Sequence, residues 1–268
     1  MGLVKRHRLL AAGAATVVLG LGVLAWLLLS VDEPGPASVS DALARFHDAD
    51  AEGRSSASGP PDGVYRYRGS GDEHLSLPPL HQADGEVMPG TVTHGADGCW
   101  TFRIDFNAVH RQSWRHCRAR AAPVAETAGS TGQRWDLGVT SISNTSHFSC
   151  DRPDPVRWRP TASAEVHLRC SGTNSAVDGR TTVAATWNFD GETTLQIDGH
   201  AVAADHWVGR RRLTGSQEGT ESSEAWFRAD GLLLRYERDL EVRTDSPVGA
   251  TTYTEEGWFE LTSLTPQR

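Results

Sequence analysis

The sequence predicts a mainly β protein, namely a curved antiparallel sheet, half-barrel or sandwich-like, preceded by one N-terminal transmembrane helix. Two observations predict the sheet. Apolar and polar residues alternate with a period of two, and Asp-Gly pairs typical of tight turns separate the alternating stretches. An uncharged apolar run near the N-terminus predicts the helix. No helical pattern of comparable length lies between the strands, which argues against parallel β-α-β folds.

The apolar run covers residues 9–30 and is long enough for a helix to cross the hydrocarbon core of a membrane. Basic residues precede it and acidic residues follow it. Because basic residues stay on the cytoplasmic side, we expect residues 1–8 to be a cytoplasmic stub and the rest of the chain to be extracytoplasmic. This predicts a single-pass protein of the cell membrane. A cleaved signal peptide is the alternative, although its apolar region is usually shorter.

The charge balance limits the partners. The chain has 26 Lys and Arg against 34 Asp and Glu, a formal net charge of -8. Lys5, Arg6 and Arg8 all precede the apolar run, so the outward-facing part is more acidic still. Nucleic acid and anionic lipid headgroups are negatively charged and attract positively charged protein surfaces. We therefore expect no nucleic-acid partner, and contact with the membrane only through the N-terminal helix.

Residues 31–62 are expected to form a juxtamembrane helix and a linker. An apolar stripe at helical spacing includes Phe46, and Ser40 or Asp41 can cap the start of the helix. The stretch that follows is rich in Gly, Ser and Pro, which is typical of a flexible tether. One extracytoplasmic β domain is expected over residues 63–268.

The clearest strand covers residues 232–242. One of its faces carries Leu232, Leu234, Tyr236, Leu240 and Val242. The other face is mostly charged, so the sheet is expected to be antiparallel with one face in water. Turns are expected at the Asp-Gly pairs 190–191, 198–199 and 230–231, the last of which closes a hairpin with the preceding strand.

Four cysteines, Cys99, Cys117, Cys150 and Cys170, allow three disulfide pairings outside the cytoplasm. A hairpin with its loop at residues 107–109 places the first two opposite each other. The remaining two then pair by elimination. We therefore expect two local disulfides.

Two further cross-strand pairs support the register of this first hairpin. It places Phe102 opposite Trp114, an aromatic pair, and Asp105 opposite Arg111, a pair of opposite charges. Each such pair stabilises an antiparallel sheet by a few tenths of a kcal/mol to about 1 kcal/mol. The agreement of three pairs favours this register.

A metal site is the alternative use of the later cysteines, because His-x-x-Cys occurs at both 147–150 and 167–170. In a strand, however, residues three apart point to opposite faces, so His and Cys of one motif cannot easily bind one ion. The expected compartment is also oxidising. We expect a disulfide here, with no metal and no cofactor.

Common catalytic signatures, including nucleophile elbows, zinc-protease motifs and phosphate-binding loops, do not occur in the sequence. Asp72, Glu73 and His74 stand together and could orient a water or an ion. Since neighbouring strand residues diverge, we expect them to form a surface turn instead. The protein is expected not to be an enzyme, and a metal-dependent hydrolase is the alternative.

Several stretches together resemble an uncharacterised family of exported or membrane-anchored proteins of high-GC Gram-positive bacteria. They are DGVYRYRGSGDEHLS, TVTHGADGCW, WRHC and AWFRADGLLLRYERDLEV, within residues 63–265. This resemblance implies no activity. The hairpin from Trp226 to Arg235 is also similar to half-barrel lipid carriers of the LolA and LppX type. That similarity implies a curved sheet and a hydrophobic ligand, although this chain lacks their lipidated cysteine and long helices.

Two functions follow as hypotheses. The first is binding of a hydrophobic or lipid ligand of the cell envelope, suggested by the similarity to lipid carriers and by eight tryptophans after the apolar run. The alternative is a protein–protein interaction module of the envelope that binds no small molecule. An enclosed apolar cavity would favour the first, and an exposed sheet edge or apolar patch the second.

Overall fold

The computed structural model describes residues 33–49, 59–118, 124–138, 140–151, 164–246 and 249–268. The predicted transmembrane helix at residues 9–30 lies outside this part of the chain. Among the described residues, no helix combines the length and the apolar character needed to span a membrane.

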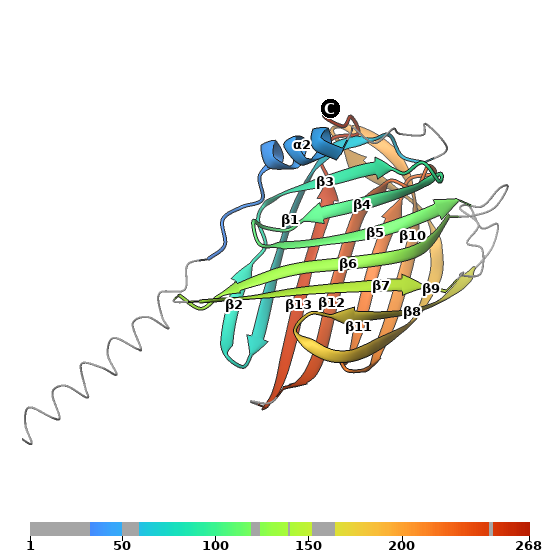
Figure 1. The fold of residues 1–268 in the computed structure, drawn as a ribbon. Helices are drawn as coiled ribbons and strands as arrows, with labels where there is room; N and C mark the ends of the chain where they lie inside the picture. The colour runs from blue at the N-terminus through green and yellow to red at the C-terminus, as the bar shows by residue number, and fades with distance from the viewer. Residues whose placement is uncertain (1–32, 50–58, 119–123, 139, 152–163, 247–248) are drawn as a thin grey trace, which may run out of the picture. The chain divides into compact units, whose positions relative to one another are not determined.

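One helix and thirteen strands form the described structure (Figure 1). They are α2 (Val39–Asp48), β1 (Gly63–Ser76), β2 (Pro79–Ala83), β3 (Val87–His94), β4 (Cys99–Asp105), β5 (His110–Arg118), β6 (Val124–Asp136), β7 (Ser141–Cys150), β8 (Glu165–Asn174), β9 (Val177–Ile197), β10 (His200–Gly215), β11 (Glu218–Phe227), β12 (Leu233–Ser246) and β13 (Gly249–Leu261).

The chain divides into two compact units. The described part of one unit consists mainly of the end of β6 and the start of β7, within Arg134–Ile142. The other combines Pro34–Gln133 with Ser143–Arg268, and it contains α2 and most of the sheet. The interior described below belongs to this second unit.

The sheet is antiparallel and closes on itself. From β3 to β13 each strand pairs with the next along the chain, and β1 pairs with β3 on one side and with β13 on the other. The result is a closed barrel of 12 strands, to which β2 adds a short pairing with the end of β1. The predicted antiparallel β class is confirmed. The half-barrel and the sandwich are wrong, because the β1–β13 pairing joins the two edges that a half-barrel leaves open.

Both predicted disulfides are confirmed. Cys99 and Cys117 lie directly opposite each other with an S–S distance of 2.07 Å, and Cys150 and Cys170 do so with 2.09 Å. Since the cysteine sulfurs bond to each other, the His-x-x-Cys motifs hold no thiolate ligands for a metal.

The predicted register of the β4–β5 hairpin is also confirmed, with Phe102 opposite Trp114 and Asp105 opposite Arg111. The aromatic rings of the first pair stack at 5.9 Å. The Asp105 carboxylate instead contacts Arg103 on its own strand and Arg45 of α2, at 2.7 and 2.5 Å.

Two of the three expected Asp-Gly turns are confirmed. Residues 198–199 join β9 to β10, and residues 230–231 lie between β11 and β12. The turn at residues 190–191 is wrong, because β9 continues through it as a strand. There the β9–β10 register shifts next to His206, so Gly191, with φ of 136°, accommodates an irregularity of the ladder rather than a chain reversal.

Helix α2 is confirmed, but Ser38 caps it rather than Ser40 or Asp41. The Ser38 hydroxyl accepts a hydrogen bond from the backbone N–H of Asp41 at 3.1 Å. On the buried side of the helix, Phe46 is 2% exposed and packs with Val64 of β1. Figure 1 shows α2 beside β3, so the helix covers part of the barrel wall.

The interior of the barrel changes character along the strands. Large side chains that pack on one another fill one part, among them Tyr65, Tyr67, Trp100, Phe102, Trp114, Tyr236 and Phe259. Further along the same strands, the inward positions carry polar and charged side chains. These polar positions form the candidate site.

Candidate binding site inside the barrel

Nine polar side chains from six strands and one loop meet inside the barrel, and we call them the interior polar cluster. They are Glu73, Gln82, Asp84, His110, Gln112, Gln133, Arg238, Tyr253 and Glu255. Each strand residue occupies an inward position of the period-two pattern, as Glu73 does two positions after Gly71 and six after Tyr67 on β1.

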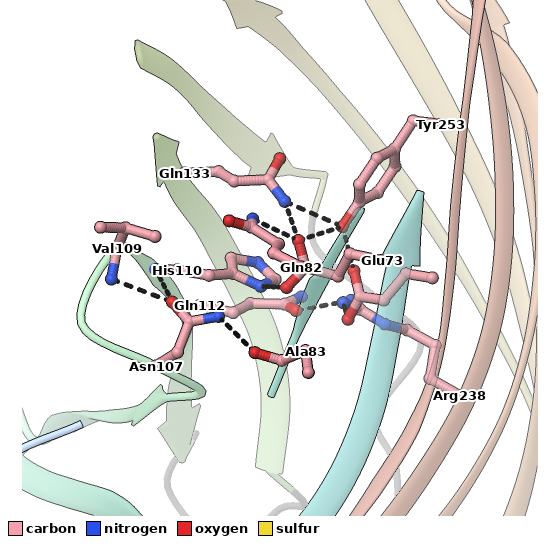
Figure 2. Close-up of polar contacts among 11 residues, drawn as sticks. Glu73, Gln82, Ala83, Asn107, Val109, His110, Gln112, Gln133, Arg238 and Tyr253 are labelled. Atoms are coloured by element: carbon pink, nitrogen blue, oxygen red, sulfur yellow. Dashed lines mark hydrogen bonds and ion pairs between the residues drawn. The ribbon is translucent and has the colours of Figure 1, made fainter. Parts of the chain in front are cut away.

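Glu73 lies at the centre of this cluster (Figure 2). One carboxylate oxygen, Oε1, is 2.5 Å from Nδ1 of His110, and both side chains are 0% exposed. The other oxygen, Oε2, accepts hydrogen bonds from the amides of Gln82, at 2.8 Å, and of Gln133. Tyr253 places its hydroxyl 3.3 Å from the same oxygen. Glu73 is therefore held from several strands at once.

Arg238 and Glu255 form the second charged pair of the cluster. The Arg238 guanidinium donates to Glu255 Oε1 and, at 2.5 Å, to Oε1 of Gln112. The Tyr253 hydroxyl donates to the other Glu255 oxygen at 2.7 Å. Because Tyr253 also lies beside Glu73, the two ion pairs belong to one network.

The loop before β5 positions His110. The side-chain oxygen of Asn107 accepts hydrogen bonds from the backbone N–H groups of Val109 and His110, at 2.9 and 2.8 Å. Its amide nitrogen donates to the Ala83 carbonyl at 3.2 Å. An Asx turn of this kind favours a tight loop. Phe106 then stacks on the imidazole with ring centroids 4.6 Å apart, which fixes the ring plane.

A missing side chain makes room for Asp84. Gly71 faces inward on β1, and a Cβ at that position would overlap Oδ2 of Asp84 and lie 3.0 Å from the Glu256 carbonyl. The backbone N–H of Asp84 donates to the Gly71 carbonyl at 2.9 Å. Glycine at position 71 thus allows a second carboxylate to approach Glu73.

Burial and neighbouring charges shift the pKa values of this acid–histidine group in opposite directions. For Glu73, burial raises the pKa, but the His110 charge and hydrogen bonds outweigh it and lower the pKa to about 2. For His110, burial lowers the pKa, but Glu73 and the other nearby carboxylates raise it to about 9. Burial and the adjacent Glu73 raise the pKa of Asp84 to about 8. At neutral pH, Glu73 is therefore ionised, while His110 and Asp84 hold protons.

Two buried atoms of this group have no hydrogen-bond partner among the described residues, namely Nε2 of His110 and Oδ1 of Asp84. A buried polar atom without a partner costs about 1–3 kcal/mol. Glu73, Asp84 and His110 also offer ligand atoms that all lie within 4.8 Å of one another. Chemically, this arrangement suits a cation or a hydrogen-bonding ligand.

The expectation of a surface turn at residues 72–74 is wrong. These residues belong to β1, which continues to Ser76. The alternation of side chains along the strand therefore places Glu73 inside the barrel. The expected divergence of neighbours is confirmed, since Asp72 and His74 are exposed on the outside. There Asp72 contacts His81 of β2 at 2.8 Å, away from the interior polar cluster.

Reasoning from the sequence did not identify the other members of the cluster, although a signal was present. The face of β12 that carries Leu234, Tyr236 and Leu240 also carries Arg238, a charge on an otherwise apolar stripe. On β5, the inward face that carries Trp114 also carries Gln112 and His110, so polar residues again extend an aromatic core face. A charged or polar residue in register with a core face was the available indication.

A second polar group lies further along the inner wall. Arg211 contacts Glu126 at 3.0 Å and Glu221 at 3.7 Å, and Tyr236 donates to Glu221 at 3.0 Å. Burial raises the pKa of Glu126, although the charge of Arg211 opposes this shift. Glu126 also lies near the Cys150–Cys170 disulfide, but those sulfurs are not available as thiolates. We interpret this group as structural.

Comparisons of the chain with known protein-family models, with curated proteins and with solved structures find no match. The function therefore has to be argued from the geometry of the barrel itself.

Proposed function

We propose that this chain is a membrane-anchored, extracytoplasmic β-barrel protein that binds a small polar ligand inside the barrel. The apolar segment at residues 9–30 supports the anchor. The two disulfides support an oxidising compartment, because disulfides persist mainly outside the cytoplasm. The interior polar cluster is the binding site in this proposal.

The observation that carries the proposal is the group of buried, partly unsatisfied charges around Glu73. Replacing buried ion pairs by apolar residues of similar size often leaves a protein equally stable or more stable. A buried charged cluster is therefore weak evidence for a purely structural role. His110 Nε2 and Asp84 Oδ1 lack partners among the described residues, and a bound polar ligand would provide them.

A lipid inside the barrel is less well supported. The aromatic side chains of the interior already pack on one another, as Tyr67 does on Phe102 and Phe259 at 5.7 and 5.4 Å. An acyl chain next to the interior polar cluster would offer no hydrogen bonds to Nε2 of His110 and Oδ1 of Asp84, and leaving buried polar atoms unpartnered is costly. A polar ligand avoids this cost.

The test is native mass spectrometry of the full-length chain purified from its own membranes, followed by the same measurement under denaturing conditions. We expect a small polar ligand that is lost on denaturation. The Glu73→Gln variant should lose it, and Tyr253→Phe, which removes only one hydroxyl, should retain less of it. Glu256→Gln is the matched control, because Glu256 is exposed on the outside of β13 next to Glu255.

Three results would contradict the proposal. A lipid mass released on denaturation would favour the hydrophobic-ligand hypothesis instead. A native mass equal to that of the bare oxidised chain would favour an interaction module without a small ligand. Equal ligand content in Glu73→Gln and Glu256→Gln would place the site elsewhere.

A further inference from the structure

We infer that Glu73, Asp84 and His110 form a binding site for one divalent transition-metal ion of the Zn²⁺ class. This inference rests on the proposed function, because it names the ligand of the same site. The three side chains come from β1, from the connection after β2, and from the start of β5.

The spacing of the ligand atoms fits a single ion. The closest nitrogen and oxygen atoms of the three side chains lie within 4.8 Å of one another. Zinc binds His nitrogen and carboxylate oxygen at about 2.0–2.2 Å, so two of its ligand atoms lie at most about 4.4 Å apart. To surround one ion, the three side chains must rotate, and Nδ1 of His110 and Oε1 of Glu73, which lie 2.5 Å apart, must separate to about 3 Å or more.

The chemistry of the donors selects the class of ion. An imidazole nitrogen suits Zn²⁺ and similar first-row ions, whereas Ca²⁺ and Mg²⁺ prefer oxygen ligands alone. Binding of the ion releases to solvent the protons that Asp84 and His110 hold at neutral pH, and the two carboxylates of Glu73 and Asp84 then balance the charge of a divalent cation. Three protein ligands leave a fourth position open, as in many zinc sites that also bind water or a substrate.

The surroundings of Glu73 match the second layer of a metal site. Ligating carboxylates are usually held in place by hydrogen bonds from neighbouring side chains. Here the amides of Gln82 and Gln133 hold Oε2 of Glu73, with the Tyr253 hydroxyl beside it. Oε1 is hydrogen-bonded to Nδ1 of His110, and it is the oxygen that would exchange this contact for the ion.

The unpartnered atoms are the independent observation that points to a ligand. His110 is 1% exposed, and its Nε2 has no hydrogen-bond partner among the described residues. Oδ1 of Asp84 likewise has no hydrogen-bond partner among the described residues. Metal-bound histidines usually donate their second ring nitrogen to a carboxylate or water. Coordination together with one bound water would satisfy both atoms.

The experiment is a titration of the full-length chain, stripped with EDTA, with ZnCl₂ and separately with MnCl₂, by calorimetry. Metal content after dialysis is measured in parallel. We expect one equivalent of Zn²⁺, bound more tightly than Mn²⁺, and a raised midpoint of thermal unfolding. Asp84→Asn and His110→Gln should each weaken Zn²⁺ binding at least 10-fold. The isosteric Asp84→Asn keeps the test valid if His110→Gln does not fold.

The matched control is the double variant Asp72→Asn/His81→Gln, which removes an acid–histidine pair on the outside of the same strands. It should bind Zn²⁺ as the wild type does. Co²⁺ substitution adds a spectroscopic test, in which nitrogen and oxygen ligands give weak visible bands without an intense thiolate band. A thiolate band would assign the metal to reduced cysteines and overturn the inference.

Other outcomes also separate the two proposals. No stoichiometric binding of Zn²⁺ would overturn the metal site. If an organic ligand still leaves the wild type on denaturation, the proposed function stands without the metal. Zinc binding that is lost in the control variant, and retained in Asp84→Asn, would show chelation on the outer surface and overturn the inference as well.

Discussion

Arg238 and Glu255 form an ion pair inside the barrel, with 6% and 4% of their side chains exposed. Removing one member of a buried pair leaves the other charge uncompensated, at a cost of roughly 3–5 kcal/mol. We predict that Arg238→Met lowers the free energy of unfolding by about this amount and that adding Glu255→Gln restores part of the loss. Urea denaturation of both variants measures the difference.

The matched control for the ion pair is Arg243→Met on the same strand. Arg243 and Asp245 form an exposed pair, with 64% and 84% of their side chains accessible, so the change should cost at most about 1 kcal/mol. A double variant no more stable than Arg238→Met alone would contradict the prediction, since it would show that Glu255 is not destabilised by the loss of its partner.

The two disulfides should contribute almost equally to stability. In the chain-entropy description, the contribution depends on the length of the closed loop, and the sequence separations are 18 and 20. We predict a loss of about 3 kcal/mol for Cys99→Ser/Cys117→Ser and for Cys150→Ser/Cys170→Ser, measured by urea denaturation. A difference of more than about 2 kcal/mol between the two variants would indicate that something other than loop closure decides their contribution.

Stability should depend on pH through His116. This residue stacks on Trp100 with ring centroids 5.6 Å apart, and burial together with the charge of Arg211 lowers its pKa from 6.5 to about 4. Between these pH values, the unfolded chain binds a proton that the folded chain does not. Stability is therefore expected to fall as the pH decreases from 6.5 to 4, by on the order of 3 kcal/mol from this residue.

The variant His116→Gln isolates this contribution from those of the carboxylates. Its free energy of unfolding, followed from pH 7 to pH 4, should fall less steeply than that of the wild type. His206→Gln is the control, because His206 lies on the outer wall between Asp190 and Glu224. Parallel pH profiles for His116→Gln and the wild type would show that His116 does not cause the dependence.

The local parts of the fold were predictable from the sequence, whereas closure of the barrel was not. The β4–β5 hairpin follows from cross-strand pairs such as Phe102 with Trp114, because both strands lie next to each other in the chain. Closure depends on β1 pairing with β13, where Glu73 lies opposite Glu255, far away in the sequence. Alternation of polar and apolar residues identifies a strand and its faces, but not its distant partner.

The same distinction explains which part of the site could be anticipated. That Arg238 and His110 face inward follows from the alternation on their own strands. That Glu73 meets His110 depends on contacts between separate segments, such as the hydrogen bond of Asn107 before β5 to Ala83 at the end of β2. The unusual pKa values arise only after that contact forms, because burial and the neighbouring charge cause them. The inward direction of such site residues could thus be predicted from the sequence, but their proximity to one another could not.

Gly71 should be the least replaceable glycine near the site. A Cβ there would overlap the Asp84 carboxylate and lie 3.0 Å from the Glu256 carbonyl, and the backbone carbonyl cannot move away freely. We predict that Gly71→Ala lowers the free energy of unfolding by about 1–3 kcal/mol, the usual cost of overpacking. Gly35→Ala is the control, since nothing lies within 4 Å of a Cβ at that position. Equal stability of the two variants in urea denaturation would mean that Asp84 can leave its place beside Glu73 at no cost.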